Sequence, residues 1–106
     1  MKTITHNLKT DSAVFCLSWA EKKPFEIRYD DRCFEVGDEL VLFETKFSGE
    51  EMRNEGKPLE YTGRRIRQKI TSKVKNYGLL PDWCVLGVTE LHRESSPVTW
   101  EVKKTS

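Results

Sequence analysis

The sequence predicts an α+β, β-rich fold, namely a small β-barrel of about six strands with one main helix after the first strand. Short segments in which apolar and polar residues alternate recur along the chain, separated by Gly, Pro, Asn or Asp. Helical spacing is clear in one segment, directly after the first alternating one. A barrel is therefore favoured over a doubly wound sheet, and the length of 106 residues predicts a single domain over residues 1–106.

The chain is expected to begin with a strand, a helix and a second strand. Residues 1–9 alternate weakly and contain Thr and Ile, which favours a strand. Residues 13–20 are mostly apolar with helical spacing, and the residues before them commonly cap helices: Thr10, Asp11 and Ser12. Pro24 ends this helix near Lys22. Residues 25–29 then alternate strictly, which predicts a strand with one apolar face and one charged face.

The middle of the chain is expected to turn twice before a buried strand. After a turn at 30–32, residues 34–36 return as a short strand, and Gly37-Asp38 forms a second tight turn. The apolar run at 40–43 fits a buried strand. Residues 46–58 are polar and contain two glycines, which predicts an exposed, mobile excursion or a short helix.

The second half is expected to contain a long strand with a basic face. From 65 to 75 every other residue is polar, and five of these residues are cations: Arg65, Arg67, Lys69, Lys73 and Lys75. No acidic residue lies between Glu60 and Asp82, so this cluster is a charge asymmetry that the net charge hides. Turn residues follow, then an apolar strand at 83–88 and a last short strand at 97–102.

Composition excludes several classes of protein and site. The 18 Lys+Arg and 17 Asp+Glu give a net charge of +1, which by itself indicates neither nucleic-acid nor membrane binding. No apolar run approaches the ~20 residues that cross a bilayer, and residues 1–9 lack a signal-peptide core, so we expect a cytoplasmic monomer without membrane contact. The cysteines have no CxxC spacing and are expected to be buried and reduced: Cys16, Cys33 and Cys84. His6 and His92 are isolated, so no metal or cofactor is expected.

Four groups of residues, in this order, resemble the ASCH domain of the PUA-like superfamily. They are His6-x-Leu8-Lys9; Lys23-Pro24-Phe25-Glu26-Ile27-Arg28; Asp31-Arg32 with Phe34 and Val36-Gly37-Asp38; and Tyr61-Thr62-Gly63-Arg64 with Trp83-Cys84-Val85-Leu86-Gly87. The resemblance covers residues 4–88 and is closest to a compact ASCH-related family of unknown function in phage and bacterial genomes. Two positions depart from the signature: Glu21 replaces its glycine, which changes the helix end, and Pro24 replaces a small hydroxylated residue, which stiffens the cleft.

The resemblance implies that Lys23, Glu26 and Arg28 line a ligand cleft between the helix and the barrel. In that arrangement the Arg28 guanidinium binds a phosphate or a base edge, the Lys23 ammonium adds a charge, and the Glu26 carboxylate accepts from an amine or a ribose hydroxyl. The alternative is a solvated salt-bridge ladder of Glu26, Arg28 and Asp30 on the charged face of their strand, each exposed link contributing no more than ~1 kcal/mol.

The predicted site residues form two sets. The first set is expected to bind the ligand: Lys23, Glu26, Arg28, Asp31, Arg32, Tyr61, Arg64 and Trp83. The second is expected to follow a nucleic-acid backbone: Arg65, Arg67, Lys69, Lys73 and Lys75. For the second set the alternative is an edge strand whose cations prevent aggregation.

The favoured function is a noncatalytic module that binds RNA or a nucleotide. The first alternative is a small amidohydrolase acting on an acylated cytidine-like nucleoside, because Lys23 matches the lysine of ASCH enzymes of that kind, with Glu26 as the base. Against it, Glu26 aligns with their threonine, and the helical segment that carries their catalytic acid is replaced by the turn at 76–83. The second alternative is a modulator that binds another protein.

Overall fold

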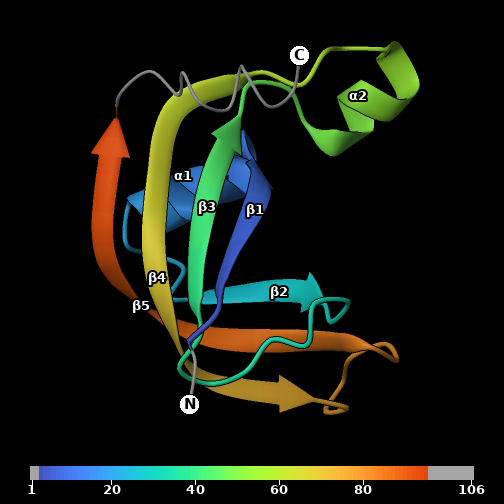
Figure 1. The fold of residues 1–106 in the computed structure, drawn as a ribbon. Helices are drawn as coiled ribbons and strands as arrows, with labels where there is room; N and C mark the ends of the chain where they lie inside the picture. The colour runs from blue at the N-terminus through green and yellow to red at the C-terminus, as the bar shows by residue number, and fades with distance from the viewer. Residues whose placement is uncertain (1–2, 96–106) are drawn as a thin grey trace.

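The computed structural model describes residues 3–95, and within them one curled sheet carries two helices (Figure 1). The elements in chain order are β1 (Thr5–Asp11), α1 (Ser12–Trp19), β2 (Phe25–Tyr29), β3 (Glu39–Thr45), α2 (Gly49–Glu55), β4 (Tyr61–Lys75) and β5 (Trp83–Ser95). The strand order is β1-β3-β4-β5-β2, with β1 parallel to β3 and the other neighbours antiparallel. The β-rich α+β fold with a barrel-like sheet is therefore confirmed.

The long strands β4 and β5 bend, so that β2 runs across β1 and β3 rather than alongside them (Figure 1). The pairing of these two strands shifts between Arg67 and Gln68 and again between Ile70 and Ser72. Such bulges bend a strand and increase its twist. The bending brings the two ends of the sheet, β1 and β2, toward each other without backbone pairing between them.

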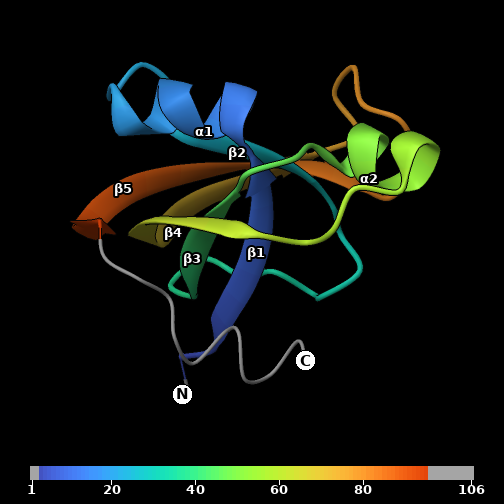
Figure 2. The same ribbon diagram turned by 90° about the horizontal axis from the view of Figure 1, so that it is seen from above.

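The core lies inside the curl of the sheet and is covered by α1 (Figure 2). Its buried residues are Leu8, Phe15, Phe34, Leu40, Leu42, Ile66, Ile70, Cys84, Leu86 and Val88. The helix contributes Phe15, against which Trp19 stacks with ring centroids 5.8 Å apart. Alternate residues of each strand reach this core because successive side chains of a strand point to opposite faces.

Most of the expected elements are present. The strands at 25–29, 40–43 and 65–75 and the main helix are confirmed within a few residues, and the strand expected at 83–88 is present but continues to Ser95. The short helix in 46–58 is α2, whose Ser48 and Glu51 form a capping box. At α1 the capping residue is Asp11, but its side chain accepts from the Gly49 amide at 3.1 Å instead of capping the helix. The strand expected at 97–102 lies outside the described residues.

The prediction of a short strand at 34–36 is wrong. The segment between β2 and β3 is a connection organised by two carboxylates, because the Phe34 amide donates to Asp30 at 3.1 Å and the Glu35 amide donates to Asp38 at 3.2 Å. Phe34 is buried in the core while Val36 is exposed. Side-chain acceptors therefore replace the strand hydrogen bonds that the alternation suggested.

The prediction that β4 has a single basic face is also wrong. Arg65, Arg67 and Lys69 pair with Phe43, Val41 and Glu39 of β3, on the face opposite the core. After the bulge near Thr71, Lys73 pairs with Leu86 and Lys75 with Cys84, both buried, so these two lysines point to the core side. An inserted residue reverses the alternation, and for this reason the five cations are divided between two faces.

Two of the three cysteines do not have the expected burial. Cys16 and Cys33 are exposed, whereas Cys84 is buried and its burial raises the pKa of the thiol. Within residues 3–95 no helix is long and apolar enough to cross a membrane.

Candidate functional site

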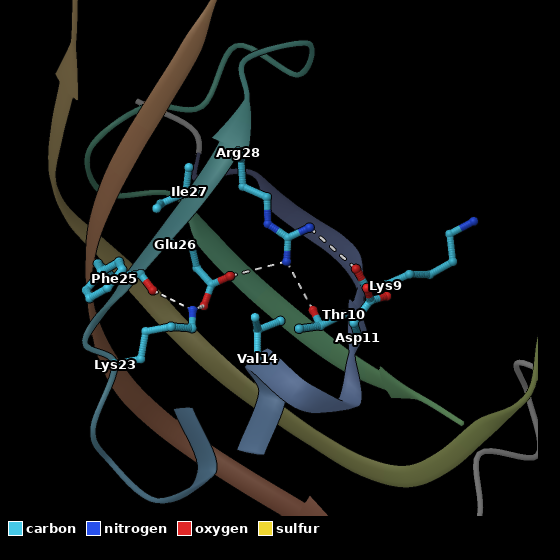
Figure 3. A pocket seen from close by; sticks show the side chains of 9 residues that line it. All are labelled: Lys9, Thr10, Asp11, Val14, Lys23, Phe25, Glu26, Ile27 and Arg28. Atoms are coloured by element: carbon cyan, nitrogen blue, oxygen red, sulfur yellow. Dashed lines mark hydrogen bonds and ion pairs between the residues drawn. The ribbon is translucent and has the colours of Figure 1, made fainter. Parts of the chain in front are cut away.

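The two ends of the curled sheet are joined by arginine side chains rather than by strand pairing. Arg28 on β2 donates to the Thr10 hydroxyl at 3.1 Å and to the Lys9 carbonyl at 3.4 Å, both on β1. Arg32, just after β2, donates to the Asn7 carbonyl at 2.8 Å. The space between β1 and β2, which we call the seam, is thus bridged at two points by guanidinium groups. Figure 3 shows the bridge made by Arg28.

Glu26 lies at the base of the seam, with only 2% of its surface exposed. One carboxylate oxygen accepts from Lys23 Nζ at 2.6 Å and from the Ser18 hydroxyl at 3.5 Å. The other oxygen accepts from Arg28 Nη2 at 3.2 Å (Figure 3). A buried carboxylate requires such charged donors, because burial without a partner would cost several kcal/mol.

The alternative of a solvated salt-bridge ladder on β2 is therefore wrong. The strand buries its charged face and exposes its apolar face, which is the reverse of the usual arrangement. The apolar side chains face outward, since Phe25, Ile27 and Tyr29 are 37%, 53% and 49% exposed. The charged face points into the barrel, where Glu26 contacts two cations. Asp30 does not extend this row, because its carboxylate contacts Lys73 Nζ at 2.8 Å instead.

The connection between α1 and β2 places Lys23 beside Glu26. Helix α1 ends at Trp19, and Glu21 has φ 60°, a left-handed conformation that glycine adopts more easily. Pro24 then holds the chain extended into β2. Lys23 Nζ also donates to the Phe25 carbonyl at 2.7 Å, so two acceptors at the start of β2, Phe25 and Glu26, hold its ammonium.

Two hollows follow the seam. The first has a volume of about 270 Å³. Its lining residues are Lys9, Thr10, Asp11, Val14, Lys23, Phe25, Glu26, Ile27 and Arg28 (Figure 3). The second, about 300 Å³, shares Ile27 and Arg28 with the first. It continues to Asp31, Arg32 and the Tyr29–Trp83 ring pair, whose centroids are 5.9 Å apart.

Residues 5–88 match the family described as a domain of unknown function, DUF3850. The chain belongs to this family. No curated protein matches it. The matched range begins in β1 and ends in β5, so it contains every residue that lines the seam of this DUF3850 domain.

The seam of the DUF3850 domain brings together six of the eight residues predicted to bind a ligand. These are Lys23, Glu26, Arg28, Asp31, Arg32 and Trp83. Tyr61 lies elsewhere, packed against Phe43 on the opposite face of the sheet with ring centroids 5.8 Å apart. Sequence reasoning did not assign Thr10, Asp11 and Val14 to the site, because they reach it only when β1 curls toward β2.

Arg64 is paired with a buried carboxylate and does not line the seam. Its Nε and Nη2 donate to the two oxygens of Glu44, each at 2.8 Å. The guanidinium also lies over the Phe15 and Trp19 rings, 5.3 and 4.9 Å from their centroids. Glu44 follows Leu40 and Leu42 on the core side of β3. A carboxylate at the next position of this apolar face could have indicated a buried ion pair, and sequence reasoning did not use it.

The cations predicted to follow a nucleic-acid backbone are mostly paired within the protein. Arg65 pairs with Glu94, and Arg67 pairs with Glu39. Lys73 and Lys75 share the Asp30 carboxylate at 2.8 and 3.2 Å, and these contacts, led by the hydrogen bond from Lys73, lower the pKa of Asp30. Lys69 is exposed. The structure does not assemble these five side chains into one surface.

Proposed function

We propose that this domain binds RNA or a nucleotide in the first seam hollow, with Arg28 as the principal phosphate-binding residue. The observation that carries the proposal is the weak bonding of its guanidinium. The three hydrogen bonds of Arg28 are 3.1, 3.2 and 3.4 Å long, so all exceed the most common N–H···O length of about 2.9–3.0 Å and the longest exceeds the usual range. Its Nε has no hydrogen-bond partner among the described residues. A phosphate would offer this fork shorter, charge-assisted bonds.

The surroundings of Arg28 support an anionic ligand with an apolar part. Glu26 is buried and already accepts from Lys23, Arg28 and Ser18, so we assign it the role of fixing the two cations. Lys9 extends outward at the rim, where its ammonium can meet a second phosphate oxygen (Figure 3). Val14 and Ile27 add an apolar wall for a sugar or a base.

The order of these residues along the chain also supports a relationship to ASCH domains, which we include in the proposal. Lys23, Glu26 and Arg28 are the three positions that match the ASCH signature, and all three line the first seam hollow. In the proposed module Lys23 and Arg28 bind the ligand, Glu26 holds these two cations in place, and the ligand is not changed covalently.

The test is a fluorescence titration of labelled single-stranded RNA against the wild type and Arg28→Ala at two salt concentrations. We expect Arg28→Ala to weaken binding at least about tenfold, because a hydrogen bond to a charged group contributes about 1.5–3 kcal/mol. Arg28→Lys, which keeps a positive charge beside Glu26, should also bind more weakly because it lacks the fork.

Arg67→Ala is the matched control, because Arg67 lies on the opposite face of the sheet and pairs with Glu39. We expect it to change the RNA affinity less than twofold, an order-of-magnitude limit for a cation remote from the site. Binding that is absent, or that is insensitive to both salt and Arg28, would refute the proposal.

A second candidate is the amidohydrolase on an acylated cytidine-like nucleoside, favoured by the contact of 2.6 Å between Lys23 Nζ and Glu26 Oε2. A general base must reach the attacked water within hydrogen-bond distance. Glu26 is buried and accepts from three side chains, which favours the noncatalytic role. Turnover of an acylated cytidine that is lost in Lys23→Met would reverse this ranking, and no turnover over hours at micromolar protein would exclude it.

A further inference from the structure

Gln68 is a buried amide in the middle of an otherwise apolar row. On the core side of β4 it lies between Ile66 and Ile70, both fully buried, and it is itself only 4% exposed. Its Oε1 has no hydrogen-bond partner among the described residues. A buried acceptor without a partner lowers the stability of a folded protein, so a leucine at this position would suit the core better.

This amide lines a hollow that is separate from the seam. The hollow has a volume of about 240 Å³ and lies beneath the connection between α1 and β2. Its lining residues are Ser18, Glu21, Lys23, Pro24, Gln68, Val88, Thr89 and Glu90. Lys23 also lines the first seam hollow, so the two hollows adjoin at this side chain. We call this space, which is distinct from both seam hollows, the Gln68 hollow.

The charges around the Gln68 hollow are already balanced by pairing. Glu90 accepts from Arg93 through two bonds of 2.8 Å, and Arg93 also interacts electrostatically with Glu21. Lys23 is paired with Glu26 at 2.6 Å. The presence of two carboxylates disfavours a phosphate here, and their pairing with Arg93 leaves little attraction for a cation. An uncharged group is the occupant that fits this balance.

We propose that the Gln68 hollow receives the nucleobase of the ligand and that Gln68 selects among bases. A primary amide offers one acceptor and two donors in a single plane, which matches the donor and acceptor edge of a base. Pro24 and Val88 supply apolar surface for its ring. This inference rests on the proposed function, in which Arg28 binds the phosphate on the other side of Lys23.

The experiment compares the wild type with Gln68→Leu, in which a side chain of similar size lacks the amide. The probes are four labelled RNA trinucleotides, each containing a single kind of base. We expect the wild type to prefer one base by about tenfold, the discrimination that one good two-bond contact provides. Gln68→Leu should lose this preference while keeping its dependence on Arg28.

The thermal midpoint without ligand supplies a second readout, because Gln68→Leu should raise it by removing the unpaired acceptor. If Gln68 served only to stabilise the fold, replacing it would lower the thermal midpoint of the protein instead of raising it. Lys69→Met is the matched control, since Lys69 is the next residue of β4 and lies exposed on the opposite face. It should change neither the base preference nor the midpoint.

The outcomes separate this inference from the proposed function. RNA binding that depends on Arg28 but shows no base preference, or a preference that survives in Gln68→Leu, overturns the inference and leaves the proposed function intact. Spermidine that displaces the RNA from the wild type but not from Gln68→Leu would mean that the hollow takes a cationic amine, which also overturns it. Absence of any RNA binding refutes both.

Discussion

Replacing Glu44 by Gln should destabilise this domain strongly at neutral pH and much less in acid. Glu44 is 2% exposed and accepts four hydrogen bonds, two from Arg64 and one each from Ser12 and Thr62. The substitution keeps the size of the side chain but leaves the Arg64 guanidinium without its counter-charge. Breaking a fully buried ion pair in this way costs about 3–5 kcal/mol, and we expect a value near the lower end because Arg64 is 29% exposed and water can reach it.

The pH dependence follows from the pKa of Glu44. Burial raises this pKa, but the hydrogen bonds from Arg64, Ser12 and Thr62 outweigh burial and lower it from 4.5 to about 2. At about 1.4 kcal/mol per unit, the ionised form contributes about 3 kcal/mol to the free energy of unfolding. Because the folded pKa lies below the unfolded one, this contribution is complete above 4.5 and is lost as the pH falls toward 2.

The assay is urea denaturation of the wild type and Glu44→Gln near pH 7 and near pH 3. We expect the difference in unfolding free energy to shrink by about 2 kcal/mol between these conditions, because near pH 3 the Glu44 carboxyl is protonated in the unfolded chain while it is still mostly ionised in the folded protein. Glu60→Gln is the control, because Glu60 pairs with Lys46 at 3.6 Å on the surface and should contribute less than about 1 kcal/mol. A difference that is small at neutral pH, or equal at both, would refute the reasoning.

Two further predictions concern the bulge of β4 and the start of α2. Lys73→Met should cost about 1–3 kcal/mol near pH 7, because Lys73 donates to Asp30 at 2.8 Å and to the Phe34 carbonyl at 2.6 Å. Lys69→Met should cost less than about 0.5 kcal/mol in the same urea titration, and equal effects would contradict the division of the basic residues between two faces. Ser48→Ala should cost about 1 kcal/mol by removing the hydroxyl that accepts from the Glu51 amide at 3.1 Å. Thermal unfolding measures this last effect, and an unchanged midpoint would mean that the cap does not stabilise the fold.

The sequence predicted the elements of this fold better than the direction in which their side chains point. Alternation located β2 and β4 correctly, because the pleat of a strand determines the period of the pattern. It did not show that β2 turns its charged face inward, because the pattern is the same whichever face is buried. Nor did it show the reversal at Thr71, since a bulge depends on the pairing of β4 with β5.

The candidate site was predictable in part for the same reason. Lys23, Glu26 and Arg28 are close in sequence, and strand geometry alone places Glu26 and Arg28 on one side. Arg64 was assigned to the ligand because it ends the Tyr61-Thr62-Gly63-Arg64 motif of the resemblance, and nothing in that motif indicates its partner. That partner is Glu44, from a different strand, and its contact with Arg64 exists only in the folded sheet.

Local patterns in the sequence were sufficient to predict a β-rich fold and the main helix with its end before Pro24, and they left residues 46–58 open between an exposed excursion and the short helix that is present, because these features depend on local backbone preferences. The tertiary structure decided which faces are buried, how β1 and β2 meet at the seam, and which charges pair. It also placed the unpaired amide of Gln68 beside a hollow bounded by two strands and the connection after α1. These features depend on contacts between residues distant in the chain, which no local pattern encodes.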